Sequence, residues 1–251
     1  MTAPGVTVEE SDGVRHVVLD RPEKKNAITA AMYATLADAL ETACDAGVGA
    51  VLLGARGAAF TAGNDLRDFL DHPPADDEAP VFRFLMALAR NEVPLIAAVR
   101  GAAVGIGTTL LLHCDLVYAA PTARFTVPFV DLGLVPENAS SVLLPRALGR
   151  ARAGAALYLG DALDAAGAYA AGMVTAVVAD DELDAVALAA ARAIAAKPRE
   201  AVRATKRLVD HDRAEIVAAI RREGAVFRER LASGEARAAM AAFFQRGSAR
   251  A

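Results

Sequence analysis

Short apolar runs alternate with amphipathic stretches through the first half of the chain. Runs of strand length occupy residues 14–20, 49–56, 93–101, 115–120 and 123–128. The third run is apolar almost without interruption, which predicts a strand that is buried on both faces. Strands that alternate with helices indicate an α/β fold with crossover connections.

Helical spacing appears first at residues 29–46. Met32, Leu36 and Leu40 recur at intervals of four there, and Thr29 is placed to cap the start of the helix. A second, shorter helix is expected at residues 108–114, directly before a strand.

The second half of the chain is mostly helical. Its expected elements are helices at 145–160 and 164–173, a strand at 174–179 and only helices after Pro198. Gly172 is the expected stop of the second helix. We place a boundary near residue 196, which divides the chain into a core region, residues 1–195, and a C-terminal helical region, residues 196–251.

Composition narrows the classes of partner. The chain has 251 residues, is 55% apolar and carries a net charge of −4 with both signs mixed, so nucleic acid is not the expected main partner. No apolar run has the length of a membrane span, and the N-terminus lacks a signal pattern. Cys44 and Cys114 form neither a disulfide framework nor a metal spacing. We expect a cytoplasmic protein without a membrane partner, a metal or a nucleotide cofactor.

Two glycine-containing turns follow predicted strands. They are "AAFTAGNDLRDF" (58–69) and "VRGAAVGIGTTLLL" (99–112). Glycine lets the backbone approach a ligand closely, and a helix start directs free N–H groups outward. Two such turns that face each other form an oxyanion hole for a polarised carbonyl. Two ordinary strand-to-helix turns are the alternative, and spacing alone leaves both open.

Other chemistries fit the sequence less well. The glycines run G-x-x-x-G-x-G, which differs from the dinucleotide pattern. Ser140 and Ser141 lack the flanking glycines of a hydrolase elbow. His113 ends an apolar helix, where a packed structural role is expected. Lys24 is either a solvated turn lysine or a phosphate contact, and the commoner use of Asp65 is to cap a helix.

Glu137 is a lone carboxylate in the apolar stretch "LGLVPENASS". It is either a working acid/base or a cap for a helix that begins near Asn138.

Several stretches together resemble the enoyl-CoA hydratase/isomerase (crotonase) family. They are "VVLDRPEKKNAIT", "AFTAGNDL", "PLIAAVRGAAVGIG", "CDLVYAAPTARFTVP", "LGLVPENASSVLLPRALG" and "AAGMVTAVV", which together cover roughly residues 8 to 180. The resemblance implies a spiral of repeated ββα units, acyl-CoA thioester substrates and a C-terminal helical region that forms a homotrimer or hexamer.

The resemblance also implies site residues. The backbone N–H groups of Asn64 and Ile106 correspond to the family's oxyanion hole. The implied substrate-binding residues are Lys24, Ala27, Ala62, Gly63, Asp65, Leu66, Gly105 and Phe129.

Two departures from the family pattern favour one reaction. Hydratases of the family carry two glutamates that activate water, and the matching positions here hold Thr109 and Phe129. "TAGNDL" and "LGLVPENASS" are instead similar to Δ3,Δ2-enoyl-CoA isomerases of the peroxisomal type, whose catalytic glutamate matches Glu137. The resemblance therefore implies an isomerase that moves a proton between C2 and C4. The alternatives are hydratase, thioesterase or decarboxylase chemistry, or a non-catalytic acyl-CoA binder.

Overall fold

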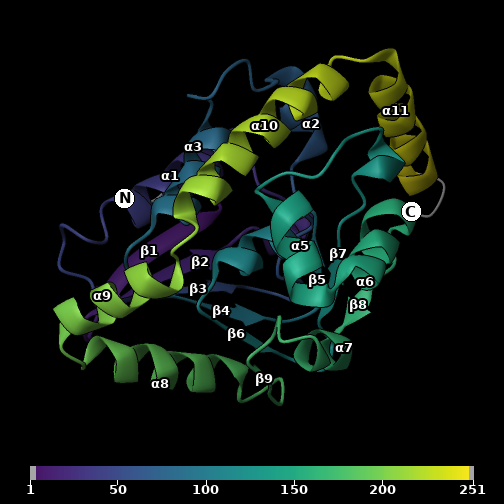
Figure 1. Ribbon diagram of the computed structural model, residues 1–251. Helices are drawn as coiled ribbons and strands as arrows, with labels where there is room; N and C mark the ends of the chain where they lie inside the picture. Colours follow the sequence, from purple (N-terminus) through teal and green to yellow (C-terminus); the bar gives the residue numbers. More distant parts are fainter. Residues whose placement is uncertain (1–3, 249–251) are drawn as a thin grey trace.

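The computed structural model describes residues 4–248 as one α/β body (Figure 1). The strands are β1 (Val6–Ser11), β2 (Val14–Leu19), β3 (Ala50–Ala55), β4 (Leu95–Val99), β5 (Ala102–Val104), β6 (Leu116–Ala119), β7 (Arg124–Thr126), β8 (Leu163–Asp164) and β9 (Ala176–Val177). The helices are α1 (Ala30–Glu41), α2 (Leu66–Asp71), α3 (Pro80–Arg90), α4 (Ile106–Thr109), α5 (Ser140–Leu148), α6 (Arg150–Gly154), α7 (Ala165–Ala170), α8 (Leu183–Ala195), α9 (Arg199–Val209), α10 (Arg213–Leu231) and α11 (Gly234–Ser248). Shorter helical turns are η1 (Pro22–Lys24), η2 (Leu110–His113), η3 (Val130–Leu132) and the π-type η4 (Ala155–Leu159).

The strands form two sheets that the chain visits in turn. The larger sheet has the order β1-β2-β3-β4-β6-β9, and the smaller sheet has the order β5-β7-β8. β4 lies in the larger sheet and β5 in the smaller one, and β6 and β7 repeat this step. After β3, the bridge between Thr61 and Ala103 brings the chain beside β5 in the same way. Each turn therefore contributes a strand to each sheet and then a helix, which is the expected ββα spiral.

Helices cover both faces of the larger sheet (Figure 1). α8 lies along one face and buries Leu183, Ala187 and Ala191 against residues such as Ile96. α1 and α3 pack together over the other face, where the main apolar core lies. Both faces of the central strand β4 are buried throughout, as its uninterrupted apolar sequence predicts.

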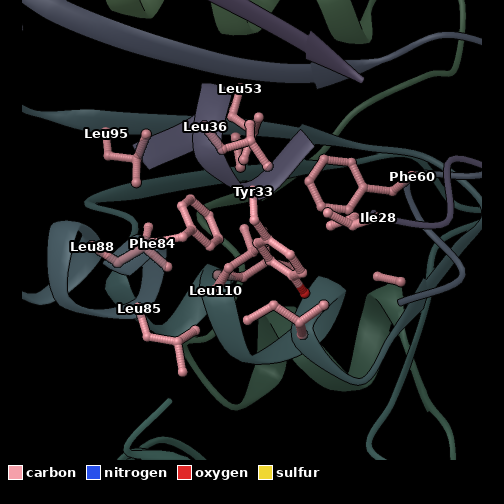
Figure 2. Close-up of a cluster of buried hydrophobic side chains, with 14 of the residues drawn as sticks. Ile28, Tyr33, Leu36, Leu53, Phe60, Phe84, Leu85, Leu88, Leu95 and Leu110 are labelled. Atoms are coloured by element: carbon pink, nitrogen blue, oxygen red, sulfur yellow. The ribbon is translucent and has the colours of Figure 1, made fainter. Parts of the chain in front are cut away.

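Tyr33 occupies the centre of the main core. Its ring lies among apolar side chains from α1, α3 and the central strands, with Phe84 5.6 Å away between ring centroids (Figure 2). Met32, Leu36 and Leu40 of the same helix are also buried, and the side chain of Thr29 accepts the N–H of Met32 as the predicted cap.

The predicted and observed elements differ in several places. No element is predicted at β1 or β5, and the single helix predicted at 145–160 is instead α5, which begins at Ser140, followed by α6 and η4. The first helix ends at Glu41 and continues as turns to Gly47, rather than reaching residue 46. No element is predicted from the sequence at residues 183–195, where α8 lies, because the side chains that α8 buries are mostly alanines and give a weak apolar stripe. Among the described residues, no helix combines the length and apolarity that a membrane crossing needs.

The C-terminal helices return to the core. α10 packs on α3 and α5, and α11 packs on η3 and α10, so residues after 196 complete the same body instead of standing apart from it (Figure 1). The division at residue 196 stays a prediction about separate roles.

Gly101 is the glycine with the closest backbone approach. Its φ is +59°, and a Cβ there would lie 1.9 Å from the carbonyl oxygen of Ala58. Gly101→Ala is expected to lower the free energy of unfolding by at least about 2 kcal/mol, because both the left-handed backbone and the contact oppose a side chain. Gly54→Ala is the control, since a Cβ there meets nothing within 4 Å. Urea unfolding with equal midpoints for both variants would contradict this description of the turn.

Candidate active site

The turns that follow Thr61, β5 and β7 meet at one large cavity of about 1440 Å³. Because these segments run parallel, their carboxyl ends lie at the same edge of the small sheet. Arg67 of α2 lies over the ring of Phe244 of α11, 5.9 Å from its centroid, and Phe69 packs edge-on against Phe227 of α10. The lining residues are Arg21, Lys24, Ala27, Thr29, Ala62, Gly63, Asn64, Asp65, Leu66, Arg67, Asp68, Phe69, Asp71, Val104, Gly105, Ile106, Pro128, Phe129, Asp131, Leu132, Leu134, Phe227, Phe243 and Phe244.

The two predicted oxyanion donors occupy equivalent positions in neighbouring turns. Thr61 and Ala103 form a parallel bridge, and Asn64 and Ile106 each follow their bridge residue by three positions. Within residues 4–248, neither backbone N–H has a hydrogen-bond acceptor. Both residues line the cavity, so both peptide groups are available to a carbonyl oxygen placed between the turns.

Gly63 explains why the first turn needs glycine. Its φ is +88°, and a Cβ there would lie 2.8 Å from the carbonyl oxygen of Val104 in the second turn. A side chain would push the turns apart, and with them the two peptide N–H groups. Tyr33 supports the first turn from below, because its hydroxyl donates to the side-chain Oδ1 of Asn64.

Phe129 and Thr109 fill the positions where the family's hydratases carry glutamates. Phe129 is buried, lines the cavity and lies 3.8 Å from the position of a Cβ on Gly105. Thr109 is fully buried, and its hydroxyl has no partner among the described residues. Neither side chain can act as the general base that activates a water molecule.

All eight predicted binding residues line the cavity, and one of them, Asp65, already has partners within the protein. Lys24 is exposed at the cavity edge, and Ala27, Ala62 and Leu66 line the cavity beside it. Asp65 caps α2 and accepts a hydrogen bond from Arg21 at 2.7 Å. Burial opposes its ionisation, but the hydrogen bonds from Arg21 and the α2 amides outweigh burial and lower its pKa.

Glu137 is buried, and of the two roles expected from the sequence its setting excludes the helix cap. Its side chain is 3% exposed and its Oε1 has no hydrogen-bond partner in the described part of the chain. It caps no helix, because α5 begins at Ser140 and its N-cap, Ala139, has no side-chain cap bond. Glu137 also does not line the open cavity, unlike the other predicted site residues. It lies in the interior beside it, near Tyr33.

The burial of Glu137 changes its acidity. Loss of water, and to a smaller extent the negative charge of Glu223, together raise the pKa of Glu137 to about 8. Burial likewise raises the pKa of Tyr33, with the charge of Glu137 as the second cause. A carboxyl group of this acidity exchanges protons readily with a weak carbon acid at near-neutral pH.

Some residues of the site are not predicted from the sequence. Phe69, Leu134 and Phe227 line the cavity, and Tyr33 and Glu223 lie behind it. The sequence does contain a sign of Glu223: this acidic residue stands on the apolar face of its helix, three residues after Ile220 and four before Phe227. Among residues 4–248, no group of three or more His, Cys, Asp or Glu side chains is arranged to hold a metal ion.

Comparison with known proteins places this chain. A model of the family described as enoyl-CoA hydratase/isomerase matches residues 9–250. The chain belongs to the enoyl-CoA hydratase/isomerase family. A solved structure titled as an enoyl-CoA hydratase/isomerase, from Pseudoalteromonas atlantica T6c, has a TM-score of 0.91 at 45% identity, covering 96% of this chain and 97% of that one. The crotonase fold expected from the sequence is therefore confirmed.

Relatives within the enoyl-CoA hydratase/isomerase family carry names of two activities. Enoyl-CoA delta isomerase 2 of Homo sapiens is 36% identical over 252 residues, which is 97% of this chain and 64% of that protein. The 1,2-epoxyphenylacetyl-CoA isomerase of Escherichia coli (strain K12) is 40% identical over 194 residues, 74% of each chain. Other relatives are named probable enoyl-CoA hydratases. These matches establish the family, whose members carry isomerase names as well as hydratase names.

The raised pKa of Glu137 predicts a pH dependence of stability. Between pH 4.5, the ordinary pKa of a glutamate carboxyl group, and about pH 8, the folded state keeps a proton that the unfolded chain releases. A rise in pH through this window therefore favours unfolding, by up to about 1.4 kcal/mol per pH unit from this one group. Glu137→Gln cannot lose the proton, so its unfolding free energy should fall less steeply with pH than that of the native protein.

Denaturant unfolding at a series of pH values measures this difference in slope. Glu229→Gln is the matched control, because Glu229 is exposed on α10. Equal slopes for the native protein and the Glu137 variant would show that Glu137 ionises in the folded state as it does in water.

Proposed function

We propose that this protein is a Δ3,Δ2-enoyl-CoA isomerase with Glu137 as the proton carrier. The observation that carries the proposal is the combination of one buried carboxyl group with two unpaired peptide N–H groups at neighbouring turns. The names of two relatives, both isomerases of CoA thioesters, support the same choice.

The proposed reaction needs one base and one oxyanion site. The carboxylate of Glu137 removes a proton from C2 of a 3-enoyl thioester, and the C–H electron pair passes into the thioester carbonyl to form a dienolate. The N–H groups of Asn64 and Ile106 hydrogen-bond the resulting oxyanion. The O–H bond of Glu137 then breaks as its proton joins C4, which leaves the conjugated 2-enoyl thioester and restores the carboxylate.

The environment of Glu137 favours proton transfer over hydration. Addition of water needs an activated water molecule beside C3. At the positions that match the glutamates of hydratases, Phe129 offers only a ring and Thr109 only a methyl group and a hydroxyl. A single carboxyl group suffices when a proton moves within the substrate. The proposal requires the acyl group to reach beyond the open cavity into the interior. A second cavity of about 350 Å³ offers a route, since Tyr33 lines it and Asp68 and Phe69 line both cavities.

Glu137→Gln tests the mechanism. The variant keeps the size of the side chain but removes the base, so conversion of a 3-enoyl-CoA should fall by roughly 10²–10⁴-fold. Affinity for the acyl-CoA should change little, because the peptide donors and the cavity remain. The native rate should rise with pH, reach half of its maximum near pH 8 and level off above that value, as Glu137 ionises. The formation of conjugated thioester absorbance measures the rate.

Asp131→Asn is the control for that experiment. Asp131 is the other carboxylate of the same stretch and lines the cavity at an exposed position. Its variant should keep nearly native turnover. Near-native turnover by the Glu137 variant would rule out the mechanism, and a native protein that hydrates a 2-enoyl-CoA faster than it isomerises a 3-enoyl-CoA would favour the hydratase alternative.

We also propose that the chain forms a trimer or a dimer of trimers. Members of the family typically oligomerise, and the surface beside the cavity exposes apolar side chains. Val130 of η3 and Tyr158 and Leu159 of the adjoining η4 are all exposed, and the two segments pack together. Such a patch on an isolated chain favours association.

Leu159→Asp should weaken this assembly, because a carboxylate at an apolar contact loses its hydration. Sedimentation velocity should then detect a lower mass than for the native protein at the same micromolar concentration. Ala185→Asp, on the exposed side of α8, is the control and should leave the mass unchanged. A monomeric native protein would contradict the proposal.

A further inference from the structure

Helix α10 brings a second buried carboxyl group to the turn that carries Glu137. Glu223 is 9% exposed, and its Oε1 accepts hydrogen bonds from the backbone N–H of Ser141, at 3.0 Å, and from the Ser141 hydroxyl. Its other oxygen, Oε2, has no partner in the described part of the chain, and neither has Oε1 of Glu137. Two carboxyl groups from distant parts of the sequence thus each keep an unpaired oxygen in one buried region.

The backbone after Glu137 needs support from outside its own segment. Asn138 and Ala139 both have left-handed φ values, +61° and +57°, although neither is glycine. Such a pair costs energy unless the surroundings hold it. Glu223 accepts an N–H from the first turn of α5, a task that a side-chain cap usually performs and that Ala139 cannot. The ring of His113 holds the other side through a 3.0 Å hydrogen bond to the carbonyl oxygen of Asn138.

The charges around the two carboxyl groups are few. Burial raises the pKa of Glu223, and the hydrogen bonds from Ser141 and from the backbone of Ala139 act against this rise. The exposed Arg222 acts on Glu223 in the same direction as those bonds. Burial lowers the pKa of His113, and Tyr33 holds its proton. No described cation is therefore bonded to either carboxyl group, and two negative charges at this depth repel each other strongly.

We propose that Glu223 is a positioning residue for Glu137: it holds the turn that presents Glu137, and the two carboxyl groups carry one proton between them. When that proton resides on Glu223, Glu137 is left as the carboxylate that can accept a proton from carbon. The catalytic consequence rests on the proposed isomerase function, whereas the shared proton and the held turn do not. The C-terminal helical region thereby takes part in proton transfer that the core region performs.

Two substitutions separate the two parts of the proposal. Glu223→Gln keeps an oxygen acceptor for Ser141 but removes the second acid, so Glu137 should titrate in a single step at lower pH than in the native protein. Glu223→Leu removes the acceptor as well, so the turn loses its hold. Its kcat should fall by roughly 10- to 100-fold with little change in KM, the scale expected when a reacting group is displaced.

Carbon-13 NMR of protein labelled at the glutamate carboxyl carbons provides a readout that does not depend on activity. Glu137→Gln and Glu223→Gln assign the two signals, and Glu229→Gln is the control on the same helix. In the native protein both signals should follow the same two titration steps, as coupled groups do. Identical titration of Glu137 in the native protein and in Glu223→Gln would overturn the shared proton. Unchanged kcat in Glu223→Leu would overturn the positioning role.

These measurements remain decisive if the proposed reaction is wrong. A native protein without isomerase activity whose carboxyl signals titrate together would refute the proposed function and support the carboxyl pair. An active isomerase whose Glu137 titrates alone would do the reverse.

Discussion

Parallel pairing in the small sheet decides where the site lies. Thr61, Ala103 and Phe125 stand side by side across it, each in a successive turn of the spiral. The residues that follow them emerge at one edge, so the peptide groups of Asn64 and Ile106, 42 residues apart in the sequence, lie at neighbouring positions. Gly63 lets the first two turns touch, and the hydroxyl of Tyr33 holds the side chain of Asn64 in the first turn.

Burial of acid groups is the second constraint on the site. Within residues 4–248 the carboxyl group of Glu137 is buried with no hydrogen-bond partner at its Oε1, which costs stability when the group is charged. A buried carboxyl group makes the fold less stable than it could be, since an apolar residue would pack there without the free-energy cost of removing the carboxyl group from water. The same region holds a strained turn at Asn138 and Ala139, and sites that combine strain with unpaired polar atoms are often those that carry chemistry.

The sequence predicts five of the six strands of the larger sheet, all but β1, and the two turns, for reasons that are local. Uninterrupted apolar runs such as the one at β4 identify buried strands. Gly63 and Gly105 mark turns with positive φ values, which residues with a side chain rarely adopt. Glu137 is noticeable because it stands alone among apolar neighbours. In each case a residue reports its own surroundings, and no knowledge of distant segments is needed.

Pairs of distant residues are harder to predict. Tyr33 and Asn64 meet only because α1 packs behind the first turn, and Glu223 meets Ser141 only because α10 folds back across α5. The depth of Glu137 is not predicted for the same reason: Leu134 and the C-terminal helices shape the cavity wall, and their positions follow from packing. Each residue is recognisable as unusual in the sequence, but its partner is not.

The proposed oxyanion donors have a further consequence, because they belong to the peptide backbone. A mutation in the gene that replaces Asn64 or Ile106 alters a side chain and leaves the N–H in place, unless it introduces proline. The proton carrier has no such protection, since every replacement of Glu137 except aspartate removes the acid itself, and aspartate moves it by one methylene. Mutation therefore affects the two parts of the site differently. The peptide N–H groups that stabilise the oxyanion are robust to mutation, whereas the carboxyl group that moves protons can be lost or relocated by a single substitution. A scaffold of this kind can acquire a new reaction while it continues to bind the same class of substrate.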